Sequence, residues 1–208
     1  MNSVLVFIHG GEFEYFTSQS EWLGPEYLMD RHLVVVTINY RLGVLGFLST
    51  GDEHAPGNYG MKDQVEALKW VRNNIRAFGG DPDRVTIAGF EAGAASVTFH
   101  MLSPMSRGLF HGAIVMSASA LNNWTITRDP LSLAKEIADS LNCPTDNSQI
   151  MIDCIRKVPV RDIIRATREL YMKLWVIFFV LNVFSIFKIV LLNNIVNDFR
   201  MSEWTLLL

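Results

Sequence analysis

The segment around Glu91 constrains the fold of this chain more than any other. Residues 84–88 are mostly β-branched or apolar and predict a strand, while residues 92–102 are rich in small residues and predict a helix. Gly89 and Gly93 stand on either side of the junction. A strand that turns directly into a helix needs glycines there, because neighbouring side chains would clash in so sharp a turn. The segment therefore predicts a strand, a strained turn centred on Glu91, and a helix.

Apolar patterning elsewhere predicts strands that alternate with helices. Residues 4–8 form a continuous apolar run, which suits a strand buried on both faces, and residues 113–116 predict another short buried strand. In residues 61–78 and 131–141, apolar positions recur every three or four residues, so each segment predicts a helix with one buried face. This alternation predicts an α/β fold with a mostly parallel sheet and flanking helices.

The first apolar run leads directly into a pair of glycines. A His-Gly-Gly triplet that ends at Gly11 follows residues 4–8, and Glu12 comes next. Glycines after a buried strand allow backbone N–H groups to approach a bound atom closely. Alone, the triplet is more typical of a simple turn. Together with the turn at Glu91, it favours the site of a hydrolase.

These two segments resemble the type-B carboxylesterases, the cholinesterase-like branch of the α/β-hydrolases, and most closely the insect esterases. Four further stretches carry the resemblance: residues 34–43, 55–64, 78–82 and 102–110. The similarity runs from residue 4 to about residue 170. It implies a partial α/β-hydrolase fold, truncated at both ends, since full-length esterases of this family are more than twice as long. We therefore expect a fragment.

The resemblance also assigns roles within the predicted site. In these enzymes the turn is a Gly-x-Ser-x-Gly nucleophile elbow, so Glu91 stands at the nucleophile position and Gly89 and Gly93 are the elbow glycines. The triad acid and histidine follow the serine in chain order, and neither can be assigned within this chain. The implied oxyanion-hole donors are the backbone N–H groups of Gly11, Glu12 and Ala92.

Loss of the serine predicts a carboxylesterase-family chain that does not hydrolyse esters. Other α/β-hydrolases use an elbow aspartate as nucleophile, but Glu91 is one methylene longer, and misplacing an attacking atom by ~1 Å can cost ~100-fold in rate. Glu12 would add a carboxylate that opposes the negative charge of an oxyanion. Other interpretations stay open: a non-catalytic cholinesterase-like binding or adhesion protein, a defective gene product, or an active carboxylesterase in a corrected full-length form.

Two features predict a secreted or extracellular protein, although no signal peptide precedes the first predicted strand. The only cysteines, Cys143 and Cys154, lie in a segment that resembles the family's short disulfide loop. Two unpaired thiols are the alternative. Asn123 begins an Asn-Trp-Thr glycosylation sequon, which agrees with that compartment.

The composition changes near residue 171. Residues 174–192 are almost entirely apolar and, at ~1.5 Å per residue, are just long enough to span a ~30 Å bilayer. Lys188 would cost up to ~3 kcal/mol there, and the basic residues before the run would place residues 1–170 in the cytosol, contrary to the disulfide and the sequon. We therefore expect a partial carboxylesterase domain at 1–170 and an apolar tail at 171–208, for which we favour read-through over a membrane anchor.

The charge pattern limits the partners of the chain. Its formal net charge is −3, with no basic stripe, so the sequence gives no support for nucleic-acid binding. It also has no metal-ligand cluster and no phosphate-binding loop, and we expect neither a metal nor another cofactor. A small ester is the partner that the resemblance implies for active relatives.

Overall fold

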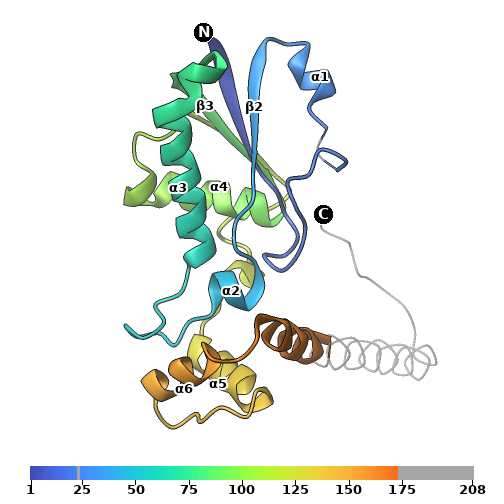
Figure 1. Cartoon of the computed structure of the whole chain (residues 1–208). Coiled ribbons are helices and arrows are strands. Elements are labelled where there is room, and N and C mark those ends of the chain that lie inside the picture. Colours follow the sequence, from blue (N-terminus) through green and yellow to red (C-terminus); the bar gives the residue numbers. More distant parts are fainter. Residues whose placement is uncertain (23, 173–208) are drawn as a thin grey trace, which may run out of the picture. The chain divides into compact units, whose positions relative to one another are not determined.

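The structure is a computed structural model that describes residues 1–22 and 24–172. The chain separates into two compact units, Met1–Pro159 and Val160–Leu208 (Figure 1). Of the second unit, residues 160–172 are described, and they are helical.

Most of the predicted apolar tail is beyond the part of the chain that the structure describes. The tail expected at 171–208 includes the candidate membrane span at 174–192, which lies outside the described residues. Within the described residues, no helix combines the length and the apolar character that crossing a membrane requires.

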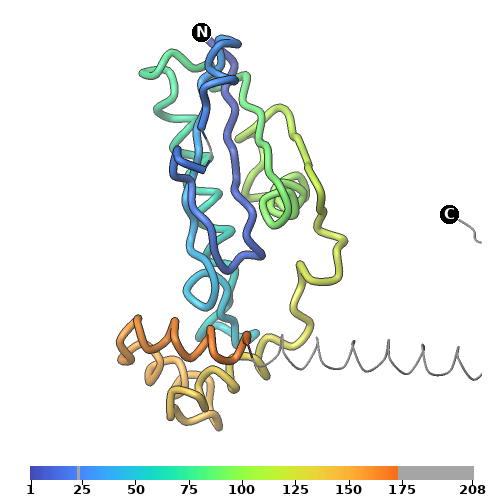
Figure 2. Tube along the Cα trace, turned by 90° about the vertical axis from the view of Figure 1, so that its right-hand side faces the viewer, coloured from blue at the N-terminus to red at the C-terminus, as the bar shows by residue number. Residues whose placement is uncertain are grey.

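Four parallel strands form the centre of the first unit (Figures 1 and 2). The strands are β1 (Asn2–Ile8), β2 (Leu33–Ile38), β3 (Gly80–Phe90) and β4 (Gly112–Met116). Their order across the sheet is β2-β1-β3-β4, and every neighbouring pair is parallel. The parallel sheet predicted from the sequence is therefore confirmed.

The strand order creates a switch point beside β1. After β1 the chain forms β2 on one side of it and then crosses to form β3 on the other. The register places Ile8 beside Gly89, so β1 and β3 end at the same edge of the sheet. Ligands of open α/β sheets bind at the carboxyl ends of the strands where the order reverses. The fold thus brings the loop after β1 and the turn after β3 to one place.

The predicted helices are present, and short helices connect the other elements. Those predicted from apolar spacing are α3 (Tyr59–Asn74), continued by the 3-10 helix η1 (Ile75–Phe78), and α5 (Pro130–Ser140). The helix predicted from its small residues is α4 (Ala92–Leu102). The short ones are α1 (Glu26–Met29), α2 (Gly43–Phe47), η2 (Pro104–Ser106), η3 (Asn123–Thr125) and α6 (Ser148–Ile155). η1 ends at Gly79, whose φ of 79° suits glycine.

The core packs against one face of the sheet. It consists of alternate residues of β1 and β3 together with apolar residues of α3, η1 and α4, including Val4, Val6, Ile8, Leu68, Val71, Ile75, Val85, Ile87 and Val97. Leu5 and Phe7, on the opposite face of β1, are only half-buried. The prediction that this strand is buried on both faces is therefore wrong for the described structure, because buried and half-buried residues alternate along it.

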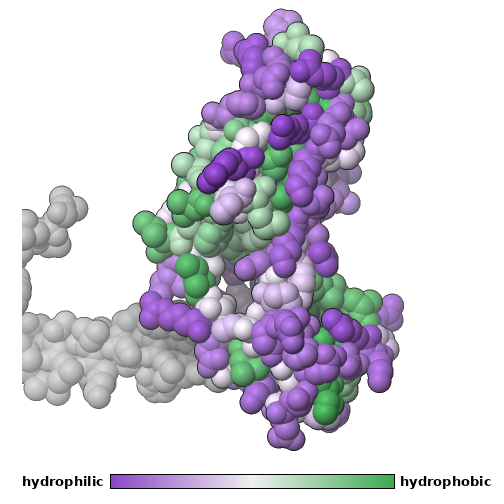
Figure 3. All heavy atoms as spheres, turned by 90° about the vertical axis from the view of Figure 1, so that its left-hand side faces the viewer, coloured by the Kyte–Doolittle hydropathy of each residue, from purple (hydrophilic) through white to green (hydrophobic). Residues whose placement is uncertain are grey.

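The prediction of a buried strand at residues 113–116 is also wrong. Ile114, Val115 and Met116 in β4 are 46%, 40% and 38% exposed. β4 is an edge strand, since β3 is its one partner among the strands described. On one face of the chain, the space-filling view shows apolar side chains among hydrophilic ones (Figure 3).

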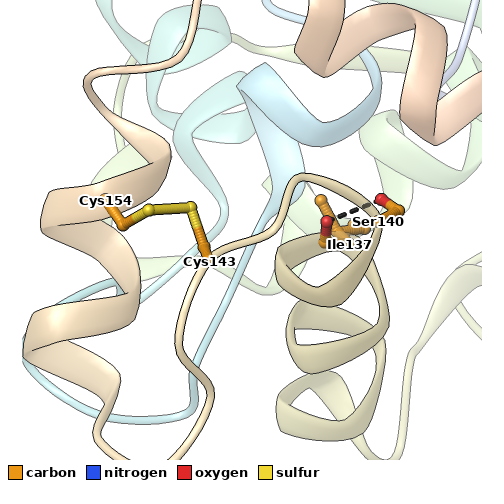
Figure 4. Close-up of a disulfide and its surroundings, with 4 residues drawn as sticks. All are labelled: Ile137, Ser140, Cys143 and Cys154. Atoms are coloured by element: carbon orange, nitrogen blue, oxygen red, sulfur yellow. Dashed lines mark hydrogen bonds between the residues drawn. A yellow bond between two sulfur atoms is a disulfide. The ribbon is translucent and has the colours of Figure 1, made fainter.

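A disulfide joins the segment after α5 to α6. The Cys143 and Cys154 sulfurs are bonded, with their Cα atoms 5.7 Å apart (Figure 4). In the last turn of α5, the Ser140 hydroxyl donates a hydrogen bond of 2.7 Å to the Ile137 carbonyl oxygen. The pairing implied by the family resemblance is therefore present in the structure, and the alternative of two free thiols is not.

Candidate active site

Two glycines let the turn after β3 pack against the end of β1. A Cβ atom on Gly93 would lie 2.0 Å from the Ile8 carbonyl oxygen, and one on Gly89 would lie 2.2 Å from the Gly93 carbonyl oxygen. Side chains do not approach backbone that closely, so a larger residue at either position would force the strand and the helix apart. This close packing is the physical reason for a glycine on each side of Glu91.

Glu91 has the strained backbone expected of the central residue in such a turn. Its φ and ψ are 56° and −117°, a region that residues with a Cβ rarely adopt. Its N–H donates to the Met116 carbonyl oxygen at 3.0 Å, and its carbonyl oxygen accepts from the Ala95 N–H at 3.0 Å. Bonds to β4 on one side and α4 on the other hold this conformation in place.

The Glu91 carboxylate binds the backbone of the loop after β1. Its Oε2 atom accepts hydrogen bonds from the Gly11 N–H at 2.8 Å and the Glu12 N–H at 3.0 Å. Gly11 and Glu12 both have positive φ, 99° and 55°, and backbone amides in such loops can converge on a single anion. The carboxylate oxygen therefore lies on two of the three N–H groups predicted to form an oxyanion hole.

The other predicted site residues are placed differently. Ala92 is fully buried at the start of α4, but among the described residues the donors to the Glu91 carboxylate are the Gly11 and Glu12 amides. Glu12 is exposed and contributes its backbone to the site. The negative group found on the amides is thus the side chain of Glu91. The sequence pattern gave no signal of this contact.

Tyr40 holds the start of the loop after β1 in place. Its hydroxyl donates to the His9 carbonyl oxygen at 2.9 Å, and its ring stacks on the His9 ring with centroids 4.6 Å apart. Burial raises the pKa of Tyr40 well above its usual value, and the negative charge of Glu91 raises it further. The hydroxyl therefore stays protonated and remains a donor to the loop.

No histidine of the chain forms a hydrogen bond with Glu91 in the structure. All five histidines lie within the described residues. His9 is 1% exposed, and its Nδ1 lies 2.8 Å from the Gly10 carbonyl oxygen. Burial lowers the pKa of His9, against a smaller raising effect of that hydrogen bond, so Nδ1 is best assigned as the N–H donor. The Nδ1 of His111 accepts from the Val85 N–H at 3.3 Å.

A buried polar network that the sequence did not reveal links α3 to α4. His100 lies between the Gln64 side-chain oxygen and the Ser106 hydroxyl, 2.8 Å from each. The Gln64 amide donates to the Ser96 hydroxyl at 3.2 Å, and Ser96 donates to the Ala92 carbonyl oxygen at 2.9 Å. The network supports the helix turn next to Glu91. Its one sequence signal is Gln64, a polar residue beside the apolar positions of a predicted helix.

Because His100 is buried, we expect the folded protein to lose stability in acid. Burial lowers the pKa of His100 from 6.5 to about 4. Between these values the unfolded chain takes up a proton that the folded chain does not, so stability falls as the pH drops from 6.5 towards 4. The free energy of unfolding should lose about 3 kcal/mol through this residue. Urea unfolding at several pH values measures it. A His100→Gln variant with the same pH dependence as the wild type would contradict the assignment.

The predicted glycosylation site and the two cysteines lie in segments of the chain that follow β4. Asn123 is an exposed residue at the start of η3, and the disulfide lies between α5 and α6. Within the described part of the chain, no group of three histidine, cysteine, aspartate or glutamate side chains is arranged to hold a metal ion.

Comparisons with known proteins point to one family. A sequence model of the carboxylesterase family matches residues 1–198. This match extends beyond about residue 170, where the resemblance described from the sequence motifs ends. The domain boundary at residue 170 stays a prediction. Esterase FE4 of Myzus persicae is 51% identical over 165 residues, which are 79% of this chain and 29% of the esterase. Venom carboxylesterase-6 of Apis mellifera is 49% identical over 166 residues, 80% of this chain and 29% of that enzyme.

A solved structure supports the same fold. Juvenile hormone esterase from Manduca sexta, with OTFP covalently attached, superimposes with a TM-score of 0.77 and is 37% identical. The comparison covers 80% of this chain and 32% of the enzyme. The chain thus spans less than a third of the length of each of these relatives.

Proposed function

Because this chain belongs to the carboxylesterase family, we propose that its site descends from a carboxylic ester hydrolase and no longer hydrolyses esters. The observation that carries the proposal is the pair of hydrogen bonds from the Gly11 and Glu12 N–H groups to the Glu91 carboxylate. In an esterase, such N–H groups stabilise the negative oxygen of the tetrahedral intermediate. Here they already bind a negative oxygen.

A mechanism in which Glu91 attacks the ester is not supported by this geometry. Attack would require the ester carbonyl oxygen to bind the Gly11 and Glu12 amides while the carboxylate approached the carbonyl carbon. The Glu91 Oε2 atom lies on both amides, where that carbonyl oxygen would bind. Hydrolysis of the resulting ester would also need a base to activate water, and none of the five histidines forms a hydrogen bond with Glu91 in the described structure.

The proposal further places the chain in an oxidising compartment, as a secreted or extracellular protein. The disulfide between Cys143 and Cys154 supports this, because such bonds persist outside the reducing cytosol. The name of a relative, Venom carboxylesterase-6, agrees with it. The small ester expected as the partner of active relatives is then not a substrate that this chain turns over.

Labelling of the wild-type chain tests the proposal. The full chain, produced through a secretory pathway, is treated with a fluorophosphonate probe and assayed on an activated short-chain ester, beside a carboxylesterase that retains its serine. We expect no stoichiometric label and no turnover above that of heat-denatured protein. Stoichiometric labelling, mapped by mass spectrometry to any residue of the chain, would overturn the proposal.

A further inference from the structure

We propose that Asn123 carries an N-linked glycan, and that this glycan stands beside the loop that binds Glu91. The Asn123-Trp124-Thr125 segment is the only Asn-x-Ser/Thr sequon in the sequence. It folds as the short helix η3, and Asn123 is exposed. This modification is independent of whether the site hydrolyses esters.

The two neighbouring asparagines have different surroundings. The Asn122 side-chain oxygen accepts from the Ser119 N–H at 2.7 Å and so holds the turn before η3. The Asn123 side chain has no hydrogen-bond partner within residues 1–22 and 24–172, so its amide is free to carry a substituent. A sugar on Asn123 would break no hydrogen bond that the structure describes.

Trp124 connects the sequon to the candidate site. Its ring lies against that of Phe13, with centroids 6.4 Å apart. Phe13 directly follows Glu12, whose N–H donates to Glu91, and it also packs against Phe47 at 5.0 Å. The attachment point is therefore one residue from a side chain that contacts the loop. A glycan there stands at the edge of the site.

The surface around Asn123 gives the glycan a function. Leu121 and Ile126 are 94% and 59% exposed, and Trp124 is 48% exposed. These three large apolar side chains are exposed within six residues of sequence, and exposed apolar surface favours association with other molecules. A bulky hydrophilic glycan in the middle of this segment would shield them and keep the chain soluble.

The reaction that attaches the glycan is a transfer from a lipid-linked oligosaccharide diphosphate. The Asn123 Nδ2 atom forms a bond to the anomeric carbon of the first sugar, and the bond from that carbon to the diphosphate oxygen breaks. The amide loses one proton to the transferase, and the lipid diphosphate leaves with the electron pair. No oxidant or reductant is involved.

Mass spectrometry of the full chain tests the proposal. The chain is expressed behind a secretion leader in a glycosylating eukaryotic host, and protein from both cells and medium is analysed, so that retention in the cell does not hide the modification. We expect a glycopeptide containing Asn123 and its conversion to aspartate by peptide N-glycosidase. Fully unmodified Asn123, in a host that glycosylates a reporter protein at the same time, would overturn the proposal.

A matched pair of variants separates the sequon from the fold. Thr125→Ser keeps both the hydroxyl and the sequon, and should keep the glycan. Asn123→Gln removes the sequon without removing a described hydrogen bond, and should lose the glycan and most of the soluble secreted yield. Thr125→Val should lose the glycan too, but it also removes the hydroxyl that donates to the Ala120 and Asn122 carbonyl oxygens, so Asn123→Gln is the decisive variant. Equal soluble yield from the glycosylated and unglycosylated chains would contradict the shielding role.

Discussion

Replacing Glu91 by serine will not turn this chain into an esterase. A serine hydroxyl is a weak nucleophile until a positioned histidine takes its proton. His9 and His100 are engaged in other hydrogen bonds, and none of the five histidines, all within the described residues, forms a hydrogen bond with Glu91. Without that base, we expect Glu91→Ser to turn over esters roughly 10⁶-fold more slowly than an intact triad, and to show no stoichiometric fluorophosphonate labelling.

Two further variants make this result interpretable. Glu91→Ala removes the carboxylate and adds no hydroxyl, so it gives the background rate. Glu91→Ser combined with Glu12→Gly also removes the second carboxylate of the loop, and we expect no recovery, because Glu12 is exposed and donates through its backbone. Because an oxyanion hole alone gives some acceleration, trace turnover agrees with the account. Multiple turnover by Glu91→Ser at esterase rates would reveal a base that acts at position 91 and would contradict it.

The second large effect concerns stability at the same residue. Glu91→Gly and Glu91→Ala both lose the hydrogen bonds to Gly11 and Glu12, but only alanine keeps a Cβ at φ 56° and ψ −117°. Such a conformation costs about 1–3 kcal/mol for a residue other than glycine. We therefore expect Glu91→Gly to be more stable than Glu91→Ala by at least about 1 kcal/mol in urea unfolding, even though glycine loses more entropy on folding.

An exposed helical position provides the control. Glu66 lies on the exposed side of α3, where Glu66→Ala should be more stable than Glu66→Gly by about 1 kcal/mol. Both Glu66 variants lose the same ion pair with Lys69. The difference in stability between the two variants therefore reports only the backbone preference of alanine over glycine. The opposite order at position 91 identifies strain in the turn. The same order at both positions would show that the Glu91 backbone is not strained.

Local patterns predicted the elements of the fold but not their burial. The helix predicted at residues 92–102 is α4 with the same bounds, because the turn residues before it and the small residues within it act locally. β3 begins at Gly80, four residues before the predicted start, because Asn2 of β1 pairs with Gly80. β4 has the apolar composition of a buried strand but lies at the edge of the described sheet. Its exposure depends on strand order, which its own residues do not encode.

The candidate site was predictable to a similar extent. The glycines around Glu91 and the triplet after β1 identified the residues, since each requirement is local. The contact between the Glu91 carboxylate and the Gly11 and Glu12 amides depends on the register that places Ile8 beside Gly89. That register joins segments about 80 residues apart in the chain. The sequence instead suggested Glu12 as the carboxylate that would oppose an oxyanion, and its side chain is exposed.

A crystal structure of the full chain tests the central claim most directly, because the claim concerns the position of one carboxylate. The account predicts electron density for the Glu91 side chain with Oε2 close to 2.8 Å from the Gly11 nitrogen and 3.0 Å from the Glu12 nitrogen. A water molecule or a solvent anion on these two nitrogens, with the Glu91 side chain turned away, would show that the oxyanion donors are open and would contradict the account.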